Sequence, residues 1–205
     1  MRKQLAPLAT LSALVLIVAL SACSAEPGPE PTAEASAPTL DSVSFTDGAT
    51  LPPDADVSWG DGFANDDNWE EVTHLTEPGR WMYINTDRTC TAAFGGGALR
   101  DSAVMDDREA SDAVITADVG DDLGDLDGLV TDGYFLKYGS EEAQIAHRQF
   151  SITIDGLGRF MAVRAFAALD YSVQVMVMCD GVDVNAAVLD VLSKNVISIE
   201  PESLG

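Results

Sequence analysis

The sequence predicts an α+β fold: an antiparallel sheet of about five or six strands, a C-terminal helix packed on it, and one disulfide. Three observations lead to this prediction. Short stretches of the C-terminal third alternate apolar and polar residues, which is typical of half-buried strands. Residues 184–192 then change to the spacing of an amphipathic helix. Beyond residue 23 the chain contains only two cysteines, enough for one bridge.

Three consecutive antiparallel strands are expected in the C-terminal third. The first covers residues 150–154, where apolar and polar side chains alternate, and the second is the apolar run 159–166. The turn sequence DGLG (155–158) separates them. The third strand presents one apolar face, whose members are Val173, Val175, Val177 and Cys179.

A helix is expected directly after these strands. Its apolar stripe recurs at intervals of three and four residues and consists of Val184, Ala187, Val188, Val191 and Leu192. Asp183 is the predicted N-cap, because an Asp side chain there accepts a hydrogen bond from a free N–H group of the first turn. Lys194 lies near the other end, where a cation interacts favourably with the helix dipole. Residues 196–199 are expected to form a short final strand.

A hairpin is predicted earlier in the chain. Apolar side chains alternate over residues 81–84 and again over 90–94, with the turn sequence NTDR between them. Between residues 95 and 133 the signals are weak. Residues 103–119 fit one helix, but Gly, Asp and Ser interrupt the pattern around them.

The N-terminus has the features of an export signal. Arg2 and Lys3 form a basic start, residues 8–20 are mostly apolar, and small residues precede Cys23. The last four residues of this segment, Leu20-Ser21-Ala22-Cys23, resemble the lipobox of bacterial lipoprotein precursors. The resemblance implies cleavage before Cys23 and a diacylglycerol on its thiol, with acyl chains such as palmitate. The alternatives are an ordinary signal peptide and an uncleaved membrane helix, for which the apolar run is short.

The chain is therefore expected to have three parts. Residues 1–22 are the signal peptide, and residues 23–44 are the acylated cysteine followed by a disordered tether rich in Pro, Glu and Ala. Residues 45–205 form a single extracytoplasmic domain. Two acyl chains hold a protein firmly at a bilayer, so we expect it to be lipid-anchored on the outer face of the cell membrane.

The two remaining cysteines are Cys90 and Cys179, and both fall on apolar strand faces. In an exported chain such a pair most simply forms a disulfide. The rival use, in a metal or catalytic site, lacks partners, because neither His74 nor His147 has a cysteine nearby in the sequence. We therefore expect a Cys90–Cys179 disulfide.

The charge of the chain excludes one class of partner. It contains 11 basic and 34 acidic residues, for a formal net charge of −23. Removal of Arg2 and Lys3 with the signal leaves nine basic residues and a charge of −25. Such a surface repels phosphate groups, so nucleic-acid binding is not expected.

Two segments are candidate sites. GDDLGDLDG (120–128) gathers four carboxylates that could bind Ca²⁺, namely Asp121, Asp122, Asp125 and Asp127. The EF-hand pattern does not fit, and a solvated acidic loop is the alternative. WGDGFANDDNWEE (59–71) combines acids with three aromatic residues that could bind sugars or a basic partner, namely Trp59, Phe63 and Trp69. Alternatively, these aromatics attach the start of the fold to its core.

No catalytic signature such as GxSxG, HExxH or a phosphate-binding loop is present in the sequence. We therefore expect a non-enzymatic binding or accessory module of the cell envelope, without a cofactor, whose partners are the membrane and an envelope protein. Two alternatives remain open. One is a small hydrolase in which carboxylates or His147 act in a cleft, and the other is a calcium-dependent adhesion or sensing module.

Overall fold

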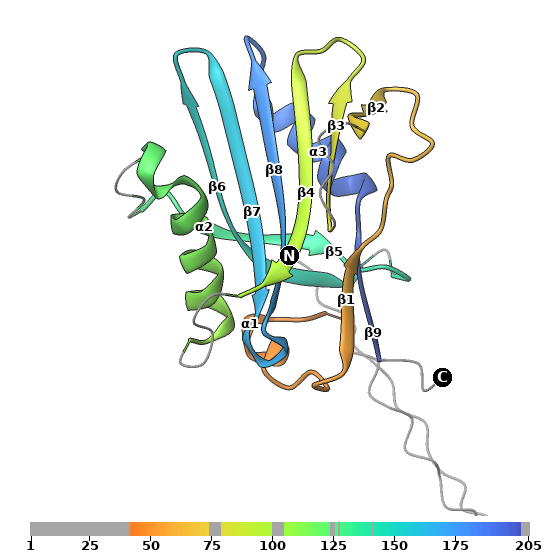
Figure 1. Ribbon diagram of the computed structural model, residues 1–205, viewed down its shortest axis with the longest axis vertical. Helices are drawn as coiled ribbons and strands as arrows, with labels where there is room; N and C mark the ends of the chain where they lie inside the picture. Colours follow the sequence, from red (N-terminus) through yellow and green to blue (C-terminus); the bar gives the residue numbers. More distant parts are fainter. Residues whose placement is uncertain are drawn as a thin grey trace, which may run out of the picture. The chain divides into compact units, whose positions relative to one another are not determined.

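The computed structural model describes residues 42–73, 79–99, 105–123, 126, 128–140 and 142–201 (Figure 1). The elements in chain order are α1 (Phe45–Gly48), β1 (Ala55–Trp59), β2 (Trp69–Glu71), β3 (Arg80–Asn85), β4 (Cys90–Ala98), α2 (Asp107–Leu123), β5 (Thr131–Leu136), β6 (Gln144–Ile154), β7 (Leu157–Phe166), the 3₁₀ turn η3 (Ala167–Leu169), β8 (Tyr171–Asp180), α3 (Val184–Lys194) and β9 (Ile197–Pro201). None of the described helices combines the length and the apolar content needed to cross a bilayer.

The described strands form two antiparallel sheets. The larger has seven strands in the order β2-β3-β4-β8-β7-β6-β5, and the smaller pairs β1 with β9. The mostly antiparallel architecture is confirmed, but the expected count of about five or six strands is wrong. β2 is only three residues long, and β5 contains Asp and Gly, so neither shows a clear period of two.

The hairpins predicted from alternating residues are confirmed. β3 pairs with β4, and β6, β7 and β8 follow one another as antiparallel neighbours. Asp155 and Gly156 connect β6 to β7, and both have positive φ, 52° and 85°. A two-residue turn with positive φ at both positions matches the twist of paired strands, which explains why Gly occupies the second position.

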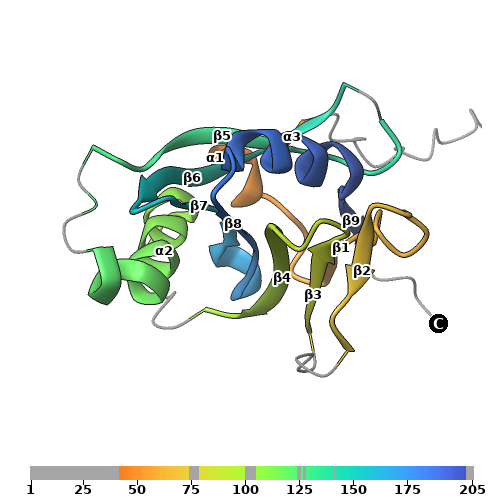
Figure 2. The same ribbon diagram turned by 90° about the horizontal axis from the view of Figure 1, so that it is seen from above.

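Two hydrophobic clusters form the core. In Figure 2, α2 and α3 lie on opposite sides of β7 and β8. One cluster includes Val175 and Val177 of β8 together with Val184, Val188 and Val191 of α3. The second cluster joins α2 to β6 and β7. It contains Ile115 and Val119 of α2, Phe150 of β6, and Met161 and Val163 of β7. The helix at 184–194 begins after Asp183 as predicted, but it is not the last element, because β9 follows it and pairs with β1.

The predicted tether extends too far. The Val43 N–H donates to Gln144 O at 2.8 Å, and the Ala146 N–H donates to Val43 O at 2.9 Å. Ser44 begins α1 with a capping box, in which its hydroxyl accepts from the Asp47 N–H and the Asp47 carboxylate accepts from the Ser44 N–H. Residues 42–44 therefore belong to the fold and not to the tether.

The disulfide is confirmed. Cys90 of β4 lies directly opposite Cys179 of β8 in the strand register, and their sulfur atoms are bonded. Both residues are buried, with 4% and 0% of their surface exposed. The bridge therefore joins the two central strands that connect the halves of the larger sheet.

Candidate functional site

The aromatic residues of the segment 59–71 belong to the core. Phe63 and Trp69 are buried and stack on each other with ring centroids 4.6 Å apart. Trp59 is half-buried, packs edge-on against Phe94 and Phe135, and donates from Nε1 to a backbone oxygen. These rings attach the start of the fold to the sheet, which is the second of the two alternatives for this segment. They do not form an exposed surface for sugars or a basic partner.

The acids of the same segment are occupied within the fold. Asp61 accepts from the Tyr83 hydroxyl at 2.8 Å, and burial with this acidic neighbour raises the pKa of Tyr83. The Lys194 ammonium pairs with Asp66 and, at 2.7 Å, with Asp190. Its hydrogen bond holds the pKa of Asp66 below its usual value. The segment therefore stabilises the junction of α3 with β2 and β3.

The four carboxylates expected as calcium ligands lie outside the side chains that the structure describes. Asp121 and Asp122 lie in the last turn of α2, whereas Asp125 and Asp127 lie outside the described residues. Among the residues that the structure describes, no three His, Cys, Asp or Glu side chains gather closely enough to hold a metal ion.

His147, the residue suggested for a hydrolase, is completely buried in β6. Its Nε2 lies 2.8 Å from Gln149 Oε1, and its ring centroid is 4.0 Å from that of Phe135. Burial lowers the pKa of His147 to about 4, with a smaller contribution from the positive charge of Arg164. A substrate cannot reach this imidazole without opening the sheet, so we assign it a structural role.

The stability of the protein is expected to fall as the pH decreases from about 6.5 to about 4 because of His147. The unfolded chain binds a proton near pH 6.5, whereas the buried imidazole binds one only near pH 4. The difference corresponds to about 3 kcal/mol, present above pH 6.5 and lost by pH 4. Urea unfolding across this range measures it.

The matched control uses the other histidine. His147→Leu should remove most of this pH dependence, whereas His74→Leu should leave it in place. Asp107 has the opposite effect on the pH dependence of stability, because burial raises its pKa. An equally steep pH dependence in His147→Leu would show that the buried imidazole is not its source.

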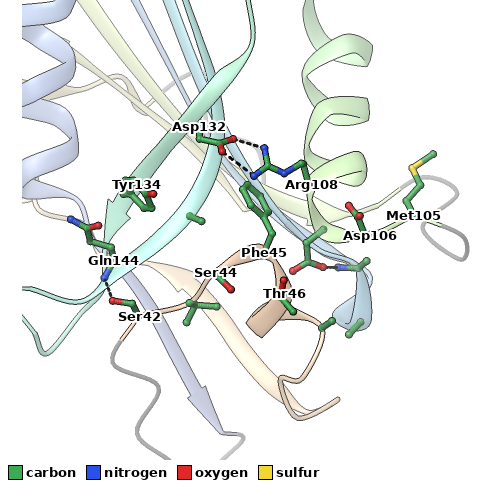
Figure 3. Close-up of a pocket in the computed structure, with 16 residues that line it drawn as sticks. Ser42, Ser44, Phe45, Thr46, Met105, Asp106, Arg108, Asp132, Tyr134 and Gln144 are labelled. Carbon is green, nitrogen blue, oxygen red and sulfur yellow. Dashed lines mark hydrogen bonds and ion pairs between the residues drawn. The ribbon is translucent and has the colours of Figure 1, made fainter.

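The main pocket lies where the described chain begins and has a volume of about 840 Å³. Its walls come from residues 42–49, the start of α2, the β5–β6 pair and the turn after β7. Figure 3 shows Tyr134 and Gln144 on the sheet side of the pocket, Thr46 below, and Arg108 on α2 across from them. The sequence patterns did not indicate this site.

A buried ion pair between Arg164 and Asp107 adjoins the floor of this pocket. The Arg164 guanidinium donates to Asp107 at 2.8 Å, and the two side chains are 0% and 1% exposed. Arg164 also donates to Ser44 O and Ala146 O, at 2.9 and 3.1 Å, while Asp107 accepts from the Ala167 N–H at 2.8 Å. Burial lowers the pKa of Arg164 to about 10 and raises the pKa of Asp107. Arg164 stays protonated at neutral pH and holds α1 to the core.

Phe45 and Gly48 fit α1 closely onto this pair. The Phe45 ring contacts two guanidinium groups, with the Arg108 and Arg164 Cζ atoms 4.5 and 4.6 Å from its centroid. Gly48 packs directly against Asp107 and Arg164, and a Cβ atom there would overlap both side chains. Only glycine therefore allows α1 to approach the ion pair this closely.

Arg108 and Asp132 at the rim are paired, and Asp106 has a separate role as a helix cap. Arg108 binds Asp132 through two hydrogen bonds of 2.6 and 2.9 Å, and Arg148 bridges Asp132 to Asp112. The Arg108 hydrogen bond is the largest contribution that lowers the pKa of Asp132 to about 2. Asp106 caps α2, accepting from the Glu109 N–H at 2.8 Å.

Three neutral polar side chains of the pocket remain available. Within the described part of the chain, the Thr46 hydroxyl, the Tyr134 hydroxyl and the Gln144 amide make no hydrogen bond. The rest of the lining is largely apolar and includes Val43, Phe45, Ala49, Met105, Ala146, Ala167 and Ala168. An open pocket of this size, with apolar surface and a few polar groups in its wall, can accept a small molecule.

A comparison with protein-family models finds no family that matches this chain, and a search of curated proteins finds no significant similarity. The function proposed below therefore rests on the residues and on the geometry of the pocket.

Proposed function

We propose that this chain is an extracytoplasmic lipoprotein, whose folded unit is a non-enzymatic binding module held at the cell membrane by acyl chains on Cys23. The observation that carries the binding role is the pocket between α1, α2 and the β5–β6 pair. The anchor is supported by the sequence Leu20-Ser21-Ala22-Cys23 and by the short apolar run before it.

The charges around the pocket favour binding over catalysis. General acid–base catalysis needs a group that exchanges protons near neutral pH. The pKa of Asp132 is held at about 2, so this carboxylate stays ionised and clamped by Arg108. Asp107 is buried and occupied by Arg164 and the Ala167 N–H. Both carboxylates thus serve to hold the walls of the pocket in place.

Ser42, the first described residue of the fold, lines the pocket, so the chain that comes from the proposed anchor at Cys23 enters the fold at the wall of the pocket. This position suits an accessory protein that takes or presents a ligand at the membrane.

Cys23→Ser is expected to release the protein from the membrane. Each buried methylene of an acyl chain contributes about 0.8 kcal/mol, so two chains hold the protein firmly and their loss leaves no comparable attachment. Fractionation of bacterial cells that express the full chain, followed by a high-salt wash, measures the change. Ser24→Ala should remain in the membrane fraction as the parent does. Retention of Cys23→Ser in the washed membrane would contradict the proposal.

A further inference from the structure

We infer that the pocket between α1, α2 and β5–β6 binds an uncharged amphiphile, a small molecule with an apolar body and hydroxyl or amide groups. This inference rests on the proposed binding function and names the ligand class for it. Three observations support it: most ionic groups of the pocket are paired, the polar groups that remain available are neutral, and the rest of the wall is apolar.

Most ionic groups of the wall are paired with one another, whereas Asp106 is held as the N-cap of α2. Arg108 uses two N–H groups on Asp132, at 2.6 and 2.9 Å, and the Arg164–Asp107 pair is almost completely buried. A ligand carboxylate or phosphate at Arg108 would lie beside the carboxylate of Asp132, and a ligand cation at Asp132 would lie beside the guanidinium groups of Arg108 and Arg148. In either case the ligand would meet a protein charge of its own sign, which opposes binding of a charged ligand.

The groups that remain available are neutral. The Tyr134 and Thr46 hydroxyls can each donate and accept, and the Gln144 amide can do both. In Figure 3 these three side chains come from β5, α1 and β6, so they surround the pocket from different sides. Such groups recognise hydroxyl, ester or amide functions without requiring charge. Tyr134 is 58% exposed, so its hydroxyl is accessible from solvent.

The remaining wall offers apolar contact. Val43 and Ala146 are 1% and 8% exposed, and they form the inner surface of the pocket together with Phe45 and small alanines. A volume of about 840 Å³ accommodates a drug-sized molecule. Burial of an apolar chain here contributes about 0.8 kcal/mol for each methylene. The walls therefore favour an acyl or similar apolar body over a sugar, whose surface is mostly polar.

The net charge of the whole chain also opposes the binding of anions. The mature chain carries a formal charge of −25, which repels anionic ligands at long range. Cations are attracted to the acidic surface in general, but this attraction is not confined to the pocket and weakens with salt. At physiological salt, specific binding in the pocket should therefore be strongest for the uncharged ligand.

The test compares three amphiphiles that share a dodecyl-length chain and differ in charge. Monododecanoylglycerol is uncharged, dodecanoate is an anion and dodecyltrimethylammonium is a cation. Each is titrated calorimetrically, below its micelle concentration and at physiological salt, into the mature chain from residue 23 with Cys23→Ser. Maltose serves as an uncharged ligand without an apolar body. We expect monododecanoylglycerol to bind at least tenfold more tightly than either ion, and maltose not to bind.

Two matched variants locate the binding. Ala168→Trp fills the pocket from an exposed position of its wall and should weaken binding at least tenfold. Ala186→Trp places the same side chain on an exposed position of α3 and should leave binding unchanged. Tyr134→Phe, which removes only the hydroxyl, should weaken binding of the acylglycerol several-fold.

The outcomes separate the ligand class from the broader proposal. An ionic probe that binds as tightly as the acylglycerol and is blocked by Ala168→Trp would overturn the inferred ligand class and leave the pocket as a binding site. Equal effects of Ala168→Trp and Ala186→Trp, or binding of none of the probes, would overturn the inference about this pocket. The Cys23→Ser fractionation decides the anchor independently of all these results.

Discussion

Replacement of Arg164 with methionine is expected to lower the free energy of unfolding by about 3–5 kcal/mol, because it leaves the carboxylate of Asp107 buried without its ionic partner. The change also removes the hydrogen bonds from Arg164 to Ser44 O and Ala146 O, so α1 loses its attachment to the core. Urea unfolding followed by tryptophan fluorescence measures the effect.

Arg88→Met is the matched control. Arg88 pairs with Glu70 at 3.4 Å, but these side chains are 70% and 67% exposed, so the loss should be at most about 1 kcal/mol. The double variant Arg164→Met/Asp107→Leu removes both buried charges and should recover part of the stability lost in Arg164→Met. Equal losses in Arg164→Met and Arg88→Met would show that the buried pair does not hold the fold together.

Removal of the disulfide is expected to cost about 4–5 kcal/mol of stability. Cys90 and Cys179 are 89 positions apart, and opening so long a loop restores conformational entropy to the unfolded chain. The double variant Cys90→Ala/Cys179→Ala keeps both buried positions filled with small apolar side chains. Its urea midpoint, compared with that of the oxidised parent, measures the difference.

Reduction of the parent protein provides the control for this experiment. Dithiothreitol should lower the stability of the parent by a similar amount and should not affect the double alanine variant. If the variant is as stable as the oxidised parent, the disulfide does not stabilise the fold by restricting the unfolded chain.

Local signals were sufficient to predict several elements. The helix α3 starts after Asp183, whose carboxylate accepts from the Asn185 N–H at 3.0 Å, as expected of an N-cap. The strands β6, β7 and β8 show alternation or long apolar runs in the sequence, and each contains the predicted segment, although β6 begins at Gln144, well before the predicted start at residue 150. In these segments, residue spacing and turn chemistry agree with the tertiary structure.

Elements that depend on distant partners were predicted poorly. β1 is stabilised by β9, which follows more than a hundred residues later, and no local pattern indicates that pairing. α2 was only weakly indicated because Gly, Asp and Ser interrupt its apolar spacing. A clearer local signal was present in Asp106 and Glu109, which form a reciprocal pair of hydrogen bonds at the start of α2.

The pocket could not be predicted from the sequence for the same reason. Its floor joins Ser44, Asp107 and Arg164, which come from three separate segments of the chain. One signal was available: Arg164 stands within the apolar run 159–166, and a charge in a buried strand requires a partner. The identity of that partner follows only from the packing of α2 against the end of β7.

The most direct test of the account is the mass of the N-terminal peptide of the protein recovered from membranes. We predict a chain that starts at Cys23 and carries a diacylglycerol on its thiol. A chain that retains residues 1–22, or one that has an unmodified Cys23, would contradict the proposal that acyl chains hold this binding module at the cell membrane.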